Sequence, residues 1–209
     1  MNPSSNPHVA LVLAAGGSRR LGHPKQLLMR GGETLVHRAV RLALATQPRR
    51  LLVVCGGHAD EVRKEVADMR VETVFNDTWQ EGLASSLRVA VAALGANEDR
   101  ALILGCDQPA LEEFHLQRLL EGAAASASRC AATLHGAARG IPAVASAPML
   151  GEARHLRGDS GLRGALQRLR SDSIHLLDAL ELQLDLDTPA DVENAIAQGW
   201  IDAGCGRSR

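Results

Sequence analysis

The sequence predicts an α/β fold: a doubly wound (Rossmann-like), mostly parallel sheet with helices on both faces. Four aliphatic runs of strand length, at 9–14, 51–55, 71–75 and 101–104, alternate with segments whose apolar residues recur at helical spacing. The first run is apolar throughout, without alternation, which is typical of a strand covered on both faces. We therefore expect it at the centre of the sheet.

Periodicity and end signals predict the helices of the first half. The first covers 34–44, with Thr34 as its N-cap, and the second covers 59–69 with charges on one side. A third helix is expected to open at Ser85 or Ser86 and to run to residue 94, and a fourth covers 112–125. Four strand–helix units in tandem favour a parallel sheet.

The alternation is less regular beyond residue 125, where a small β excursion is expected. Its predicted strands lie at 130–134, 141–145, 174–177 and 182–186, and Pro142 favours a sheet edge or a strand start. Predicted helices cover 147–156 and 162–169, and a last one begins at Thr188 and Pro189 and ends near Gly199. We expect 1–199 to form a single domain and 200–209 a flexible tail.

Composition excludes some classes of partner. The 209 residues carry a formal charge of −1, so no global field attracts nucleic acid or an anionic membrane. Aromatic content is 2 % with no Tyr, which removes the stacking surfaces of single-strand binders. We expect neither nucleic acid nor a membrane as a partner.

The cysteines and the N-terminal segment indicate a cytoplasmic protein. Cys55, Cys106, Cys130 and Cys205 are scattered, with no C-x-x-C pair and no His at zinc-ligand spacing, and are predicted to be reduced thiols. Residues 1–7 lack the basic region of a signal peptide, and the apolar run after them is too short to span a membrane.

A glycine-rich basic loop follows the first predicted strand. It matches neither G-x-G-x-x-G nor the P-loop, where His23 stands in place of the lysine. It has no acidic residue, and its backbone N–H groups suit a phosphate chain. The predicted nucleotide-binding residues here are Ala14, Ala15, Gly16, Gly17, Ser18, Arg19 and Lys25. A plain βα turn with solvated basic residues is the alternative.

The loop and four later segments resemble the MobA-like nucleotidyltransferases, in particular the branch that contains molybdenum-cofactor cytidylyltransferases. The loop has the form L-A-A-G-x-S-x-R-L-G-x-x-K, with Leu21 where Met is commonest in the family. The other segments are N-x-x-W-x-x-G-L-x-x-S from Asn76, D-x-P from Asp107, G-D-x-G-x-R from Gly158 and D-L-D-T-P-x-D from Asp185. The resemblance spans about residues 9–198.

Two aspartates are the predicted metal ligands. Asp107 follows a strand at its carboxyl end, where open α/β sheets bind ligands, and Asp187 follows the predicted strand 182–186. The resemblance implies that they hold Mg²⁺ together, and a helix cap is the alternative for each. Asp185 and Asp191 are interpreted as structural.

The resemblance also implies residues near the base and the acceptor. Gly82, Ser85 and Ser86 lie in the segment that approaches the base and ribose, although a helix cap is an equal alternative for the serines. Asp159 and Arg163 could orient the acceptor or pyrophosphate, or belong to a solvated turn. Lys25, Arg19 and Asp107 are the predicted catalytic residues.

The resemblance implies a Mg²⁺-dependent transfer of a nucleoside monophosphate from an NTP, CTP favoured, to a phosphate-bearing acceptor with release of pyrophosphate. It implies molybdopterin as the acceptor and a molybdoenzyme as a client. The alternatives are a guanylyltransferase, a sugar-phosphate or alcohol-phosphate nucleotidyltransferase, and a non-catalytic nucleotide- or cofactor-binding chaperone.

Overall fold

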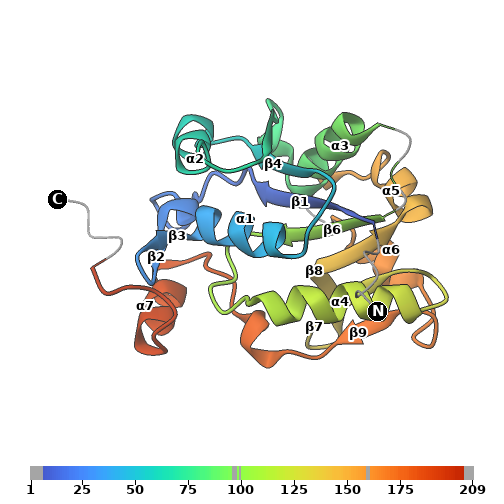
Figure 1. Ribbon diagram of the computed structural model, residues 1–209. Coiled ribbons are helices and arrows are strands. Elements are labelled where there is room, and N and C mark those ends of the chain that lie inside the picture. Colours follow the sequence, from blue (N-terminus) through green and yellow to red (C-terminus); the bar gives the residue numbers. More distant parts are fainter. Residues whose placement is uncertain (1–6, 96–97, 99, 159–160, 205–209) are drawn as a thin grey trace.

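The computed structural model describes residues 7–95, 98, 100–158 and 161–204 (Figure 1). Within these residues, seven strands form one sheet in the order β5-β4-β1-β6-β8-β7-β9. They are β1 (Val9–Ala14), β4 (Leu51–Cys55), β5 (Glu72–Phe75), β6 (Arg100–Gly105), β7 (Ala131–His135), β8 (Ala138–Ser146) and β9 (His175–Leu177). β1 pairs in parallel with β4 and β6, and every residue of β1 is buried, so its predicted central place is confirmed.

The second half of the chain extends the same sheet. β8 runs antiparallel to both β6 and β7, and β9 returns parallel to β7. β5 pairs in parallel with β4 at the other edge. The sheet is therefore mostly parallel around β1, with one antiparallel strand between β6 and β7.

Helices cover both faces of the sheet (Figure 1). On one face, α1 (Leu35–Ala45), α2 (Ala59–Glu65) and α4 (Glu113–Ala125) pack against the even-numbered residues of β1. On the other, α3 (Leu83–Leu94), α5 (Ala147–Ala153) and α6 (Arg163–Arg168) pack against the odd-numbered ones. Successive strand residues point to opposite faces, so β1 contributes to both cores. The doubly wound α/β prediction is confirmed.

A third, smaller core lies beside the sheet, under α7 (Pro189–Ala197) and the antiparallel ribbon β2 (Met29–Arg30) and β3 (Glu33–Thr34). The segment after α7, assigned to the tail by the sequence prediction, packs here: Ile201 is buried. The Asp202 carboxylate accepts hydrogen bonds from the N–H groups of Gly31 and Gly32, at 2.8 and 2.9 Å.

Three local predictions are wrong. Pro142 lies inside β8, between β6 and β7, because the β7–β8 register shifts after Ala132 and this irregularity accommodates a residue without an N–H. Residues 182–186 form no strand: Leu182 lies in the 3-10 helix η4 (Leu180–Gln183), and the chain then continues without regular structure to Leu186, whose N–H donates to the carbonyl of Asp107. The third helix begins at Leu83, with Gly82 as its N-cap residue, so neither serine caps it.

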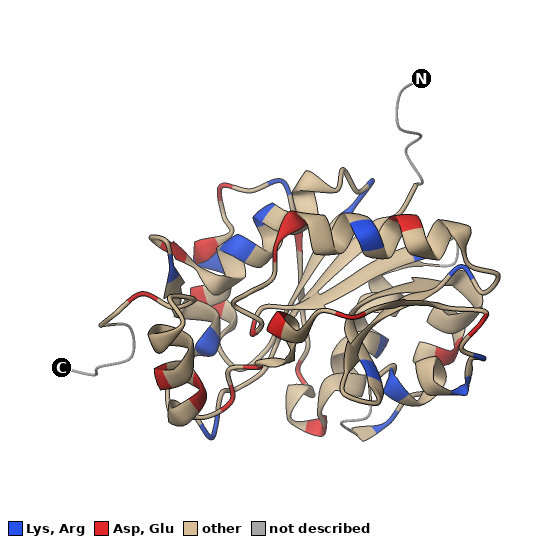
Figure 2. Ribbon diagram, turned by 90° about the horizontal axis from the view of Figure 1, so that it is seen from below, with Lys and Arg blue, Asp and Glu red and all other residues tan. Residues whose placement is uncertain are grey.

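Charged residues lie mainly on helices and loops, with both signs interspersed, while the sheet in the middle is drawn mostly in tan (Figure 2). Within the part of the chain that the structure describes, no helix is both long and apolar enough to cross a membrane.

Candidate active site

The loop after β1 is held in shape by one buried glutamine. The side chain of Gln26 lies under the loop and donates from Nε2 to the carbonyls of Ala14 and Gly16, at 2.9 and 2.6 Å. Ser18, with a positive φ of 48°, accepts from the Lys25 N–H at 3.0 Å. These bonds fix the loop before any ligand binds. Sequence reasoning missed Gln26, whose one signal is a polar residue between Lys25 and two leucines.

The two glycines of the loop have different roles. A Cβ at Gly17 would lie 2.4 Å from two ring atoms of Trp79, whereas a Cβ at Gly16 would meet no atom within 4 Å. Gly17 therefore allows the loop to pack on the indole, and Gly16 faces open space. Arg19 lies over the same indole at 5.3 Å from its centroid, a cation–π contact.

Lys25 joins the two predicted metal ligands. Its Nζ donates to Asp107 Oδ2 at 2.7 Å and to Asp187 Oδ1 at 2.9 Å, and the exposed Arg20 donates to Asp187 Oδ2 at 2.7 Å. Burial disfavours the ammonium charge, but the carboxylates of Asp107 and Asp187 outweigh it and raise the pKa of Lys25 above its ordinary range. Burial likewise opposes charge at Asp187, yet Lys25 and Arg20 keep the pKa of this carboxyl below its usual value.

Distant parts of the chain position these two carboxylates. Asp107 comes two residues after β6, and a Cβ at Gly105 would lie 2.4 Å from its Oδ1, so glycine is needed for this placement. Asp187 precedes α7, whose N-cap Thr188 forms a capping box with Asp191. Asp191 Oδ2 also accepts from the Asp187 N–H at 3.1 Å, which confirms a structural role for Asp191.

Asp185 lies closer to the site than the sequence indicated. Burial and the neighbouring charge of Asp107 raise the pKa of Asp185 to about 7. It lines a cavity together with Asp107. The D-L-D spacing was the available signal, because Asp185 and Asp187 flank the buried Leu186 and each of them lines a hollow that Asp107 also lines.

A cleft of about 400 Å³ opens in front of the loop. Most predicted site residues line it: Ala15, Gly16, Gly17, Ser18, Arg19, Lys25, Gly82, Ser86, Asp107 and Asp187. Two of the predicted nucleotide-binding residues, Ala14 and Ser85, do not line it, because they are buried behind it. Arg20, Trp79 and Gln80 line the cleft but were not among the predicted site residues.

A buried amide explains the arrangement of the two serines. Asn76 Nδ2 donates to Ser85 Oγ at 2.8 Å and to Ser86 Oγ at 3.1 Å. Ser85 in turn donates to the carbonyl of Gly82 at 2.8 Å. The hydroxyls therefore fix the start of α3 against the loop that carries Trp79, and only Ser86 reaches the cleft.

A second cavity, of about 260 Å³, adjoins the cleft and shares Leu13, Leu83 and Asp107 with it. Apolar and polar side chains share its wall, and the polar residues besides Asp107 are Gln108, His135, Arg163 and Asp185. Arg163 is thus placed next to the carboxylates, whereas Asp159 lies outside the described residues.

The carboxylates form a pair and not a complete metal site. Among the residues that the structure describes, no three His, Cys, Asp or Glu side chains are grouped to hold a metal ion. Mg²⁺ is commonly held by one or two carboxylates, substrate phosphates and water. A pair that already surrounds one cationic atom fits this donor set.

The sheet order, with a glycine loop after β1 and a carboxylate pair beside it, is that of an α/β protein of the open-sheet class, which binds ligands at the carboxyl ends of its strands. The family model of the MobA-like NTP transferase domain matches residues 10–174. The chain therefore belongs to the MobA-like NTP transferase family.

Solved structures and curated proteins agree with this membership. Rv0371c from Mycobacterium tuberculosis H37Rv is 28% identical, with TM-score 0.79, over 93% of this chain and 99% of that one. A manganese complex of Rv0371C superposes with TM-score 0.73 at 26% identity, and the match covers 91% of this chain and 98% of that one. A nucleotidyl transferase from Methanothermobacter thermautotroptrophicus is 25% identical, with TM-score 0.78, over 93% and 98%.

Among curated proteins, the bifunctional protein GlmU of Jannaschia sp. (strain CCS1) is 33% identical over 122 residues, which are 57% of this chain. The match spans only 27% of the length of that protein.

Proposed function

We propose that this protein is a divalent-metal-dependent nucleotidyltransferase that transfers a nucleoside monophosphate from an NTP to a phosphate-bearing acceptor and releases pyrophosphate. The observation that carries the proposal is the convergence of Lys25, Asp107 and Asp187 at the mouth of a preorganised glycine loop. Family membership supports the same reaction class.

The triphosphate occupies the cleft in this proposal. The backbone of the glycine loop faces it, and Lys25, Arg19 and Arg20 all line it. Guanidinium and ammonium groups form strong charge-assisted bonds with phosphate oxygens. These residues would neutralise the triphosphate and the departing pyrophosphate. Trp79, Gln80 and Ser86 line the same cleft and would contact the nucleoside.

Asp107 and Asp187 would hold the metal ion, with phosphate oxygens completing its coordination. We infer Mg²⁺, and the manganese complex of Rv0371C supports a divalent cation in this family. The ion supplies charge neutralisation at the phosphates. Lys25 spans both carboxylates, and on substrate binding it would release at least one of them and turn toward the phosphates.

The second cavity would receive the acceptor, because it meets the cleft at Asp107. A phosphate terminus is already ionised near neutral pH and needs no general base to attack. The residues of the site then have to align the acceptor phosphate with the NTP for an in-line displacement, and to stabilise the negative charge on the phosphates. The family resemblance favours CTP as donor and molybdopterin as acceptor.

Pyrophosphate release tests this proposal. Purified protein with Mg²⁺ and a molybdopterin acceptor is offered CTP, GTP, ATP and UTP separately. We expect release that depends on both acceptor and metal and is fastest with CTP. A preference for GTP would assign a guanylyltransferase, and nucleotide binding without turnover on any acceptor would contradict an enzymatic role.

A further inference from the structure

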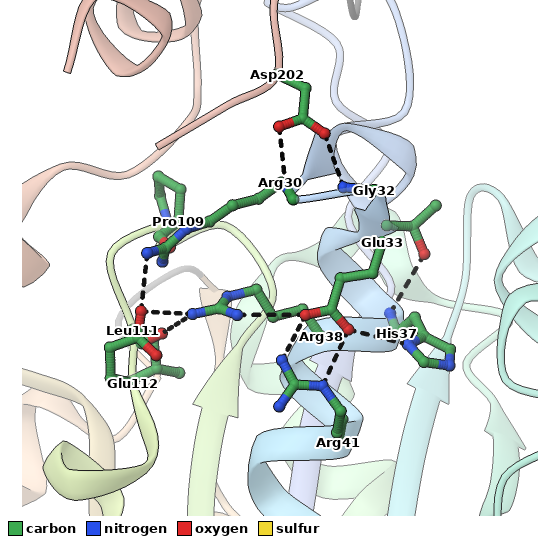
Figure 3. Close-up of polar contacts among 12 residues, drawn as sticks. Arg30, Gly32, Glu33, His37, Arg38, Arg41, Pro109, Leu111, Glu112 and Asp202 are labelled. Atoms are coloured by element: carbon green, nitrogen blue, oxygen red, sulfur yellow. Dashed lines mark hydrogen bonds and ion pairs between the residues drawn. The ribbon is translucent and has the colours of Figure 1, made fainter. Parts of the chain in front are cut away.

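A network of charged side chains, drawn in Figure 3, is not used by the proposed chemistry. It connects the β2–β3 ribbon and α1 to the loop 107–112, which begins with Asp107. Its members are Arg30, Glu33, His37, Arg38, Arg41 and Glu112.

Arg30 makes the most direct contact with the loop 107–112. Its guanidinium donates to the carbonyl of Pro109, two residues after Asp107, and to Glu112 Oε1 at 2.8 Å (Figure 3). The side chain is 22% exposed, so the pairing is partly shielded from water. A guanidinium that bonds a carbonyl and a carboxylate at once fixes the loop in two places.

Arg38 adds a second attachment from α1. It donates to the carbonyl of Leu111 at 3.0 Å and to Glu112 Oε1 at 2.6 Å. Arg41, by contrast, pairs with Glu33 and makes none of the contacts drawn to the loop (Figure 3). Arg30 and Arg38 therefore hold the loop 107–112, whereas Arg41 belongs to the network without contacting that loop.

Arg30 and Lys25 belong to the same short segment. Lys25 opens the 3-10 helix η1 (Lys25–Leu27), and Arg30 follows in β2. This segment contacts the loop 107–112 at two points: Lys25 donates to Asp107, and Arg30 donates to Pro109 and Glu112. Under the proposed function, the contact between Lys25 and Asp107 is replaced by contacts to a cation and phosphates, whereas the contacts of Arg30 with Pro109 and Glu112 can persist.

The β2–β3 turn that carries Arg30 is itself anchored. Asp202 binds the N–H groups of Gly31 and Gly32, and its own N–H donates to the carbonyl of Met29 at 2.8 Å. Arg30 is thus attached to a fixed ribbon and not to a free loop.

We propose that Arg30 is a positioning residue: through Pro109 and Glu112 it keeps the Asp107 carboxylate in place for the cation once Lys25 has released it. This inference rests on the proposed function. Arg30 does not line the cleft or the adjoining cavity, so it acts on the ion only through the loop. Residues that orient metal ligands typically change metal affinity by about 10–100-fold when removed.

The test measures Mn²⁺ binding by electron paramagnetic resonance, on the whole chain with a non-hydrolysable CTP analogue. We expect Arg30→Gln to weaken Mn²⁺ binding by about tenfold or more and to lower kcat, with little change in KM for CTP. Arg30→Lys restores part of the affinity, since one ammonium can still reach the Pro109 carbonyl. Arg41→Gln is the matched control and keeps Mn²⁺ affinity within about twofold of the unmodified protein.

Circular dichroism establishes that the variants are folded. A folded Arg30→Gln protein that binds Mn²⁺ as tightly as Arg41→Gln overturns the inference alone. If Arg30→Gln does not fold, Arg30→Lys decides in the same assay, because it keeps the charge and loses the attachment at two points. Mn²⁺ binding as tight as that of Arg41→Gln then overturns the inference. Absence of Mn²⁺ binding in the unmodified protein overturns the proposed function and this inference with it.

Discussion

The backbone N–H of Leu186 donates to the carbonyl of Asp107 at 3.0 Å. This bond attaches the segment before α7 to the loop after β6, and it brings the Asp107 and Asp187 side chains to a single ammonium. Two carboxylates far apart in the chain thereby become neighbours through backbone geometry and not only through their own charges.

Loss of the charge of Lys25 or of Asp107 should abolish most of the turnover. We expect Lys25→Ala and Asp107→Ala each to reduce kcat by about 10²-fold or more, as removal of a preorganised charge contact does. Pyrophosphate release measures the effect. Asp172→Ala is the control, because Asp172 is exposed and pairs with Arg170 on the surface. Near-normal turnover of a folded Asp107→Ala protein would contradict its metal role.

Much of this arrangement could be predicted from sequence. The strands β1, β4 and β6 are long aliphatic runs that must be buried on both faces, so their place in a parallel sheet follows from local pattern. Thr188 and Pro189 likewise give an unambiguous helix start.

The remainder depends on contacts between distant segments. Leu182 and Leu186 are apolar because they pack in two different cores, not because they form a strand. The position of Pro142 inside β8 is set by the register shift opposite it, which one strand alone does not reveal. Gln26 was missed because its Nε2 group donates to backbone carbonyls, which carry no residue-specific signal. Arg30 was missed because its partners, the Pro109 carbonyl and Glu112, lie far from it in the chain.

The two loop glycines give a matched pair of variants. Gly17→Ala places a methyl group against the Trp79 ring and should destabilise the protein by about 1–3 kcal/mol. Gly16→Ala faces open space and should change stability by less than about 0.5 kcal/mol. Chemical denaturation followed by Trp79 fluorescence in a Trp200→Phe background distinguishes them. Equal stability of the two variants would exclude the packing role of Gly17.

Removal of the Gln26 amide should loosen the glycine loop. Gln26→Ala leaves the Gly16 carbonyl without its buried donor, and we expect a loss of about 1–3 kcal/mol in unfolding free energy. The KM for the NTP should rise as well, because the loop must then be ordered by the ligand. Gln117→Ala, on the exposed side of α4, is the control. An unchanged KM would mean that the loop keeps its shape without Gln26.

Glu33 should make stability depend on pH in the acid range. The hydrogen bond from Arg41 is the largest cause that lowers the pKa of Glu33 from 4.5 to about 2, against the opposing effect of burial. A lowered pKa means that the stabilisation is complete above pH 4.5 and is lost as pH falls toward 2. The difference in unfolding free energy between the unmodified protein and Glu33→Gln should therefore shrink over this interval. A difference independent of pH would show that the charge of Glu33 contributes nothing.

A crystal structure with CTP and Mg²⁺ tests the central claim most directly. The proposed function predicts one ion bound by both Asp107 and Asp187 and by phosphate oxygens, with the Lys25 ammonium turned onto the triphosphate. An ion held elsewhere, or a Lys25 ammonium that still spans the two carboxylates while the nucleotide is bound, would contradict it.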